Sequence, residues 1–188
     1  MKFIAKSLFT LSFILILFSN SLKGQERGLE FGGAVGVASL FGNFASQTSL
    51  AGTIIFDVHH PYFDGYNLSA RFSYIQKFER FLPEDRKGRY YPFVKSLSIR
   101  VDLTQQLDET FFLEESFGLL LLNDHTFEII KDWNYGVAFS GAIGLILSQT
   151  KAEIWKLYFG MDVGQTFNNL STGFYSLQIE GKYYFSTE

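Results

Sequence analysis

The chain contains no cysteine among its 188 residues, and it has only three prolines and three histidines. Without cysteine it can form no disulfide and no thiolate metal site, and it cannot carry the N-terminal diacylglycerol of a lipoprotein. Charged residues make up 19% of the chain and give a net charge of -3, which leaves no basic surface of the kind that nucleic acid requires. We therefore expect no disulfide, no lipid anchor and no nucleic-acid partner.

Apolar residues are plentiful instead, since hydrophobic side chains account for 47% of the chain and aromatic ones for 18%. The mean hydropathy is nevertheless close to zero, so apolar and polar residues must be interleaved. The scarcity of proline permits long strands, and the 17 glycines supply turns and close-packing positions. This composition is typical of β-structure.

The first residues have the order of an export signal. Two lysines precede an apolar run over residues 8–18, which gives way to small polar residues. The run is shorter than the roughly 20 residues that a membrane-spanning helix needs, so a transmembrane anchor is the less favoured interpretation. We predict a signal peptide over residues 1–24 and one outer-membrane β-barrel domain over residues 25–188.

Beyond residue 25 the apolar side chains recur with a period of two, which predicts β-strands with one apolar face. In the first segment, Phe31, Val35 and Val37 share one face, and small residues form most of the other. Each segment has at least the roughly 9 to 11 residues of a tilted membrane-spanning strand. The eight predicted segments are Leu29 to Leu40, Thr48 to Val58, Asn67 to Lys77, Phe93 to Leu103, Phe111 to Leu121, Asn134 to Leu147, Trp155 to Val163 and Tyr175 to Phe185.

Alternation alone fits a membrane barrel, which is apolar outside, and also a soluble lipocalin-like carrier, which is apolar inside. The large apolar side chains are too many for the lumen of an eight-stranded barrel, which side chains just fill. The opposite faces hold mainly glycine, alanine, serine and threonine, which fit a narrow lumen. We therefore predict an all-β fold, an eight-stranded antiparallel up-and-down transmembrane β-barrel, with the soluble periplasmic carrier as an alternative.

The small-residue faces also carry equal numbers of cations and anions. Buried charges are tolerated when they are paired and hydrogen-bonded, so a closed lumen is expected to balance them. A solvated outer surface could reach the same balance by chance. The predicted members of this lumen charge network are Asp57, Arg71, Lys77, Arg100, Asp102, Glu114, Lys156, Asp162, Glu180 and Lys182.

The lengths of the connections follow the rule for an outer-membrane barrel. With the N-terminus in the periplasm, odd-numbered loops lie outside and are the long ones. The third and fifth connections, Phe78 to Pro92 and Leu122 to Trp133, are long, whereas the even-numbered ones are shorter. The aromatic end of the chain, Tyr183-Tyr184-Phe185, suits the level of the lipid headgroups. We expect a location in the cell outer membrane.

By strand number, alternation, loop lengths and the aromatic terminal strand, residues 25–188 resemble the small outer-membrane barrels of the OmpA and OmpX kind. The resemblance implies an outer-membrane location and assembly by the barrel insertion machinery. It implies no particular activity, so the expected role is structural or one of surface interaction.

The third connection contains candidate contacts for lipid phosphates. It mixes acidic with basic residues, among them Arg80 and Arg89, and it contains the aromatic residues Phe81 and Tyr90. Guanidinium groups bind phosphate in a bidentate manner, so this segment could contact lipopolysaccharide. A solvated charged loop is the favoured interpretation, and the lipopolysaccharide contact is kept as the alternative.

The stretch from Leu157 to Phe185 is also distantly similar to the end of the lipid A deacylase barrels, where a His-x-Ser-Asn motif precedes the final strand. The corresponding residues are Gln165-Thr166-Phe167-Asn168, and only Asn168 matches. A serine hydroxyl needs an adjacent base to attack an ester, and both groups are missing here. A lipid A or phospholipid acyl hydrolase is therefore kept only as an alternative function.

The histidines do not define a catalytic or metal site. His59 and His60 are neighbours, and neighbours on a strand point to opposite faces, so a shared metal would require a bent turn. His125 has Asp124 and Glu128 nearby on a predicted outer loop, but no serine is placed to complete a hydrolase triad. We predict no catalytic, cofactor or metal site and leave the protein partner open.

Overall fold

The computed structural model describes residues 28–42, 46–59, 66–82, 91–125, 133–150, 153–167 and 171–186. The predicted signal peptide lies outside these residues. Within them, no helix is long and apolar enough to cross a membrane.

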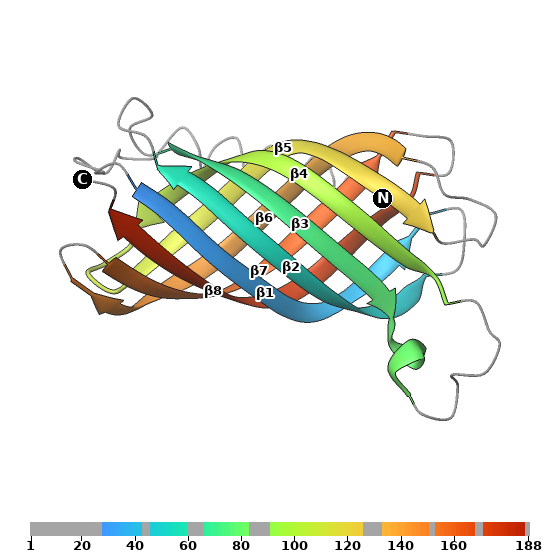
Figure 1. Cartoon of the computed structure of the whole chain (residues 1–188), viewed down its shortest axis with the longest axis horizontal. Coiled ribbons are helices and arrows are strands. Elements are labelled where there is room, and N and C mark those ends of the chain that lie inside the picture. Colours follow the sequence, from blue (N-terminus) through green and yellow to red (C-terminus); the bar gives the residue numbers. More distant parts are fainter. Residues whose placement is uncertain are drawn as a thin grey trace.

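Eight antiparallel strands form one closed barrel in chain order, as the sequence predicts (Figure 1). Each strand pairs with the next one along the chain, and β8 returns to pair with β1. Closure gives each of these strands a partner on both sides, which satisfies the backbone N–H and C=O groups without water. The strands are β1 (Gly28–Phe41), β2 (Gln47–His59), β3 (Tyr66–Lys77), β4 (Phe93–Gln106), β5 (Phe111–His125), β6 (Trp133–Gln149), β7 (Glu153–Thr166) and β8 (Gly173–Ser186), and a short 3-10 helix, η1 (Phe78–Phe81), follows β3.

The odd-numbered strands all run toward the same end of the barrel, which is called the loop end here (Figure 1). The even-numbered strands run back to the opposite end, the turn end. Because β1 starts and β8 finishes at the turn end, Gly28 and Ser186, the first and last described residues, both lie there.

The observed strands extend beyond the predicted segments at their ends. One correction concerns β5, which continues to His125, so the connection after it covers residues 126–132 and not Leu122 to Trp133. The predicted segment ends too early because Leu119 to Leu122 are all apolar, which hides the alternation. Two of these leucines point into the lumen. A bulge between Ile146 and Ser148 in β6 was not predicted either, because it lies at the end of the strand, where few residues remain to show the change of face.

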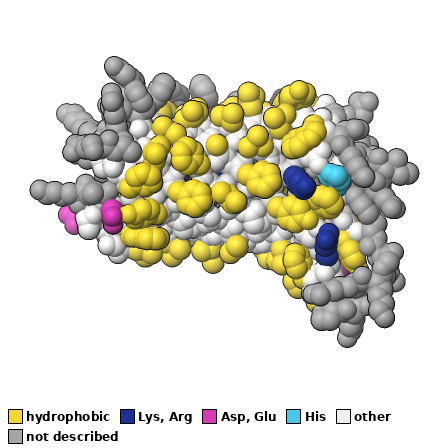
Figure 2. Space-filling view, viewed as in Figure 1, with side chains coloured by type: hydrophobic (Ala, Val, Ile, Leu, Met, Phe, Trp, Pro, Cys, Tyr) yellow, Lys and Arg dark blue, Asp and Glu magenta, His cyan; other side chains and the backbone are white. Residues whose placement is uncertain are grey.

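The two faces of the barrel wall have the predicted orientation. Phe31, Ile54 and Phe72 are exposed on the outside, and the small and charged residues between them are buried inside. Hydrophobic side chains cover much of the visible face between the two ends (Figure 2). The exterior is therefore a membrane-facing apolar belt, and the prediction of a transmembrane barrel is confirmed.

Aromatic side chains lie near both ends of this belt. Near the turn end, Trp155 packs against Tyr183 with ring centroids 4.7 Å apart. Near the loop end, Tyr74 packs against Phe93 with ring centroids 5.7 Å apart. Amphipathic rings favour the headgroup level, so the two groups mark the two membrane interfaces.

The connection between β4 and β5 is held by one carboxylate. The backbone N–H groups of Phe111 and Thr110 both donate hydrogen bonds to Asp108 Oδ1, each at 2.7 Å. These two bonds lower the pKa of Asp108, which is exposed in the turn, because they favour its charged form. The short connection therefore follows from local turn chemistry.

Two glycines of β6 provide a test of how tightly the lumen is packed. A Cβ atom built at Gly144 would collide with the ring of Phe112, whereas one built at Gly141 would meet nothing within 4 Å. We expect Gly144→Ala to lower the free energy of unfolding by about 1–3 kcal/mol, because Phe112 must move. Gly141→Ala is the control, and its effect should stay within about 0.5 kcal/mol. The urea midpoint of the folded band in detergent measures both, and equal midpoints would contradict a filled lumen.

Candidate functional site

The loop-side part of the lumen is filled by an apolar layer. Leu40, Leu122 and Phe174 are fully buried in it at 0% exposure. These side chains come from the ends of strands that meet at the loop end, so the layer lies beneath the loops. Its members are Ala38, Leu40, Ala51, Ile75, Val94, Leu120, Leu122, Ala138 and Phe174.

Nearer the turn end, the lumen is filled by ion pairs. One centre of this region is Lys182 of β8, whose side chain is 0% exposed. Its Nζ atom lies 2.9 Å from Asp57 Oδ2 of β2 and 2.7 Å from Glu114 Oε1 of β5. A third carboxylate oxygen, Oε1 of Glu180, lies 3.1 Å away. Lys182 therefore links three strands across the lumen.

The second centre is Arg71 of β3. Its Nη2 atom lies 3.2 Å from Glu114 Oε1 and 3.4 Å from Asp102 Oδ2 of β4. Its Nη1 atom lies 3.4 Å from Glu180 Oε2. Arg71 and Lys182 therefore share Glu114 and Glu180, and the two cations form one network with their carboxylates.

A separate pair crosses the lumen between β4 and β7. Both terminal nitrogens of Arg100 donate to Asp162, at 2.8 Å and 3.1 Å. The Nε atom of Arg100 also donates to Ser98 Oγ at 2.8 Å. This bidentate geometry is the strong form of an arginine–carboxylate contact.

Glu30 is a network member that the sequence analysis left out. Its Oε2 atom lies 2.8 Å from Lys156 Nζ and 2.9 Å from His59 Nε2. Tyr158 donates its hydroxyl proton to Oε1 of the same carboxylate at 3.3 Å. Glu30 lies on the small-residue face of β1, so its parity was a usable signal. The predicted network balanced its cations and anions without Glu30, so this residue was omitted.

Lys77 is the predicted member that the structure does not bring into the network. Its Nζ atom lies 2.9 Å from Glu79 Oε2, and the two side chains are 26% and 47% exposed. Lys77 is the last residue of β3 and lies beyond Ile75 of the apolar layer. Its position at the loop end, and not its parity, removes it from the lumen.

The histidines take packing and pairing positions. His59 contacts Glu30 as described above, and its ring meets Tyr184 edge-on at 5.1 Å. His125 is the last residue of β5 and stacks on Phe93 with ring centroids 4.4 Å apart. His60 lies outside the described residues. In the described part of the chain, no three His, Asp or Glu side chains are arranged to hold a metal ion.

The stretch compared with the deacylase motif gives no hydrolytic arrangement in its described part. Gln165 is exposed on the outer face, and the Thr166 hydroxyl donates to the Thr172 carbonyl at 2.8 Å. Asn168 lies outside the described residues. The contacts of Thr166 close the end of β7 and supply no base to a nucleophile.

Comparison with solved structures agrees with this geometry. The chain is similar to the crystal structure of Neisserial surface protein A, with a TM-score of 0.58, 7% identity, and coverage of 84% of this chain and 96% of that one. It is also similar to Ail, the attachment invasion locus protein of Yersinia pestis, with a TM-score of 0.50, 7% identity, and coverage of 86% and 100%. Ail in complex with the heparin analogue sucrose octasulfate gives a TM-score of 0.52 at 8% identity, with coverage of 86% and 100%.

No family model and no curated protein matches the chain. The structural likeness concerns the fold, and it shows that the chain has the architecture of the small eight-stranded outer-membrane barrels. The resemblance predicted from the sequence is therefore confirmed at the level of the fold.

The network predicts a large difference between two lysines. Lys182→Met leaves Asp57 without its cation and leaves Glu114 and Glu180 with Arg71 alone, and we expect it to lower the free energy of unfolding by about 3–5 kcal/mol. Lys77→Met removes only a partly exposed pair, and we expect a loss of at most about 1 kcal/mol. Urea titration of both refolded variants in lipid vesicles measures the difference. Similar losses for the two would show that the lumen pairs do not depend on Lys182.

Proposed function

We propose that this chain is an outer-membrane barrel with a structural or surface-interaction role, whose lumen is closed and whose loop end faces the cell exterior. The observation that carries the proposal is the filling of the lumen by two successive layers. Leu40, Leu122 and Phe174 belong to the apolar one, and Lys182 and Arg71 are the centres of the charged one. A barrel filled in this way presents its loops and its outer belt to partners.

The filled lumen argues against a diffusion pore. Eight strands leave a lumen that side chains just fill. Ions would have to pass the apolar layer and also separate the pairs that join Lys182 and Arg71 to their shared carboxylates.

The ion pairs in the lumen and the apolar outer face both argue against a soluble carrier. A lipocalin-like barrel keeps its apolar face inside for a ligand. Here the turn-side lumen holds Arg71, Arg100 and Lys182 in ion pairs, and the large apolar side chains face outward. Such an exterior requires lipid or detergent around it.

The groups that the hydrolase alternative would draw on, at the end of β7 and at His125, are engaged in other contacts. The Thr166 hydroxyl is committed to a backbone carbonyl, and the ring of His125 is stacked on Phe93. Neither arrangement resembles a base that accepts a proton from a nucleophile.

The proposal includes three expectations about the cell. Residues 1–24 act as a signal peptide that is removed on export, the barrel insertion machinery assembles the mature domain, and lipopolysaccharide surrounds its loop-side half. The exposed apolar belt with an aromatic group near each end supports insertion of the mature domain into a membrane, because such a belt is stable only in a bilayer.

Fractionation of expressing Gram-negative cells tests the location. We expect the mature protein in the outer-membrane fraction, with its N-terminus close to residue 25, because the signal is removed during export. Electrophoresis of boiled and unboiled samples should give two mobilities, since a closed barrel resists the detergent until it is heated. A soluble protein with a single mobility would overturn the proposal.

Planar bilayer recording tests the closed lumen. We expect the refolded barrel to show no steady ion conductance, because the apolar layer and the ion pairs fill its cross-section. A double variant, Leu122→Ala with Phe174→Ala, serves as the comparison, since it thins the apolar layer while leaving the ion pairs in place. Steady conductance by the unaltered, heat-modifiable barrel would show that the lumen is open.

A further inference from the structure

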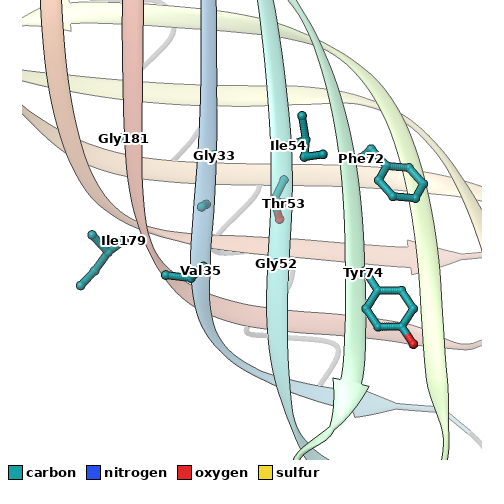
Figure 3. Close-up of a pocket in the computed structure, with 10 residues that line it drawn as sticks. Gly33, Val35, Gly52, Thr53, Ile54, Phe72, Tyr74, Ile179 and Gly181 are labelled. Atoms are coloured by element: carbon teal, nitrogen blue, oxygen red, sulfur yellow. The ribbon is translucent and has the colours of Figure 1, made fainter.

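A shallow groove crosses the membrane-facing surface over β8, β1, β2 and β3 (Figure 3). It has a volume of about 600 Å³, and its floor lies where Gly181, Gly33 and Gly52 bring no side chain to the outer surface. A Cβ atom built at Gly52 or Gly181 would meet nothing within 4 Å. The groove is therefore open to the lipid side of the wall.

The walls of the groove are apolar. Phe72 and Tyr74 stand on one side of it, and Val35 and Ile179 stand on the other (Figure 3). All four side chains are exposed on the outer face of the barrel. In a bilayer such a groove must be filled by an apolar chain, because an empty apolar space forfeits dispersion contacts on every wall.

One row of paired residues leads from the groove to the loop end. Ile179 pairs with Val35, Val35 with Gly52, Gly52 with Tyr74, and Tyr74 with Lys95. The row is oblique because the strands are tilted (Figure 1). Lys95 is the third residue of β4, close to the loop end. The side of the groove that faces the loop end therefore adjoins a cation.

Two cations adjoin this end of the groove. Lys95 Nζ lies 5.8 Å from the centre of the Phe93 ring, and no carboxylate pairs with Lys95 in the described part of the chain. Arg80 Nη1 donates to Gln76 Oε1 at 3.2 Å, and the Tyr74 hydroxyl donates to the same oxygen at 2.8 Å. Both cations are therefore neighbours of Tyr74, a wall of the groove. Basic side chains are visible at the loop end of this face (Figure 2).

Lys95 and Arg80 differ from the neighbouring Lys77, which already has an acidic partner. Lys77 lies 2.9 Å from Glu79, so its charge is already balanced. Arg80 keeps guanidinium N–H groups beyond the one bound to Gln76, and it is exposed. Guanidinium and ammonium groups at the headgroup level are suited to phosphate, which no other part of the groove would bind.

We propose that the groove together with Lys95 and Arg80 binds one lipopolysaccharide molecule of the surrounding leaflet, with an acyl chain along the groove and a lipid A phosphate at the two cations. The inference rests on the proposed function, which places the loop end in the outer leaflet. Charge complementarity selects this occupant, because a second copy of the apolar belt would leave Lys95 and Arg80 without an anion.

Lipid retention tests the site. The refolded, heat-modifiable barrel is placed in phosphatidylcholine nanodiscs that contain a small fraction of lipopolysaccharide, is released into mild detergent, and is analysed by native mass spectrometry. We expect one retained lipopolysaccharide per barrel. Lys95→Gln should lower retention about tenfold, since a charge-assisted hydrogen bond contributes roughly that factor. Lys95→Arg should restore it, because the charge is kept.

Filling the groove should have the same effect as removing the cation. Gly52→Leu places a side chain where the acyl chain would lie, and we expect retention to fall to the level of Lys95→Gln. Gly141→Leu is the matched control, because Gly141 also faces open space on the outer wall but lies on β6, away from the groove. If Gly52→Leu does not fold, Gly181→Leu repeats the test at a second open position of the groove floor.

The outcomes separate this inference from the proposed function. A barrel that is absent from the outer membrane and shows no heat shift fails the proposed function. A barrel that shifts on heating but retains lipopolysaccharide equally with and without Gly52→Leu overturns only the lipid site. A dimer that Gly52→Leu abolishes, without retained lipid, would also overturn it and would assign the groove to a second copy of the chain.

Discussion

The satisfaction of backbone hydrogen bonds in lipid is the constraint on which the rest of this structure depends. The bilayer core offers no water to an unpaired N–H or C=O group, so a sheet is stable there only when its first and last strands pair. In this chain β1 and β8 meet along their whole length, from Gly28 opposite Ser186 to Phe41 opposite Gly173. Every further property of the molecule follows from a ring of eight strands closed in this way.

Closure at eight strands makes the lumen narrow, and the narrow lumen determines which residues can point inward. Most are small. The large ones include the apolar layer, the paired rings of Phe112 and Tyr158, and charged side chains that reach a partner on a distant strand, as Arg100 does with Asp162. Glu30 illustrates the link to closure, because its contacts with His59 and Lys156 join β1 to strands on both sides of the β1–β8 pair.

The ion pairs do more to define the register than to add stability. Desolvation offsets much of the attraction between buried charges, so an apolar lumen of the same volume could be as stable. An apolar lumen would, however, accept neighbouring registers, whereas a slip of one residue would point Lys182 out of the lumen and away from Glu114. We infer that the carboxylates shared by Arg71 and Lys182 select one strand register among several that have the same strand order.

The fold could be predicted from the sequence because period-two alternation depends only on nearest neighbours along the chain. Phe31, Ile54 and Phe72 faced outward as expected for that reason. The composition of the network could not be predicted to the same degree. Glu30 and Lys156 are 126 residues apart, and only the register of the closed barrel brings them together. Lys77 lies on the lumen-facing side of β3, but its position along the barrel axis is too close to the loop end for it to join the network. That position is set by the stagger between strands.

The charged residues of the outer face bear on the orientation of the barrel in the membrane, which the lumen does not determine. Charged side chains on a membrane face are tolerated near the interfaces and costly at the midplane. Lys95 is the third residue of β4, at the loop end of that strand, and Glu115 is the fifth residue of β5, in the turn-side part of that strand. With Arg80 beside Tyr74, the loop end presents cations where the turn end presents a carboxylate. Phosphate-rich lipid at the loop end would therefore stabilise one orientation of the barrel over the other, namely the orientation of the proposed function, with the loops facing the cell exterior.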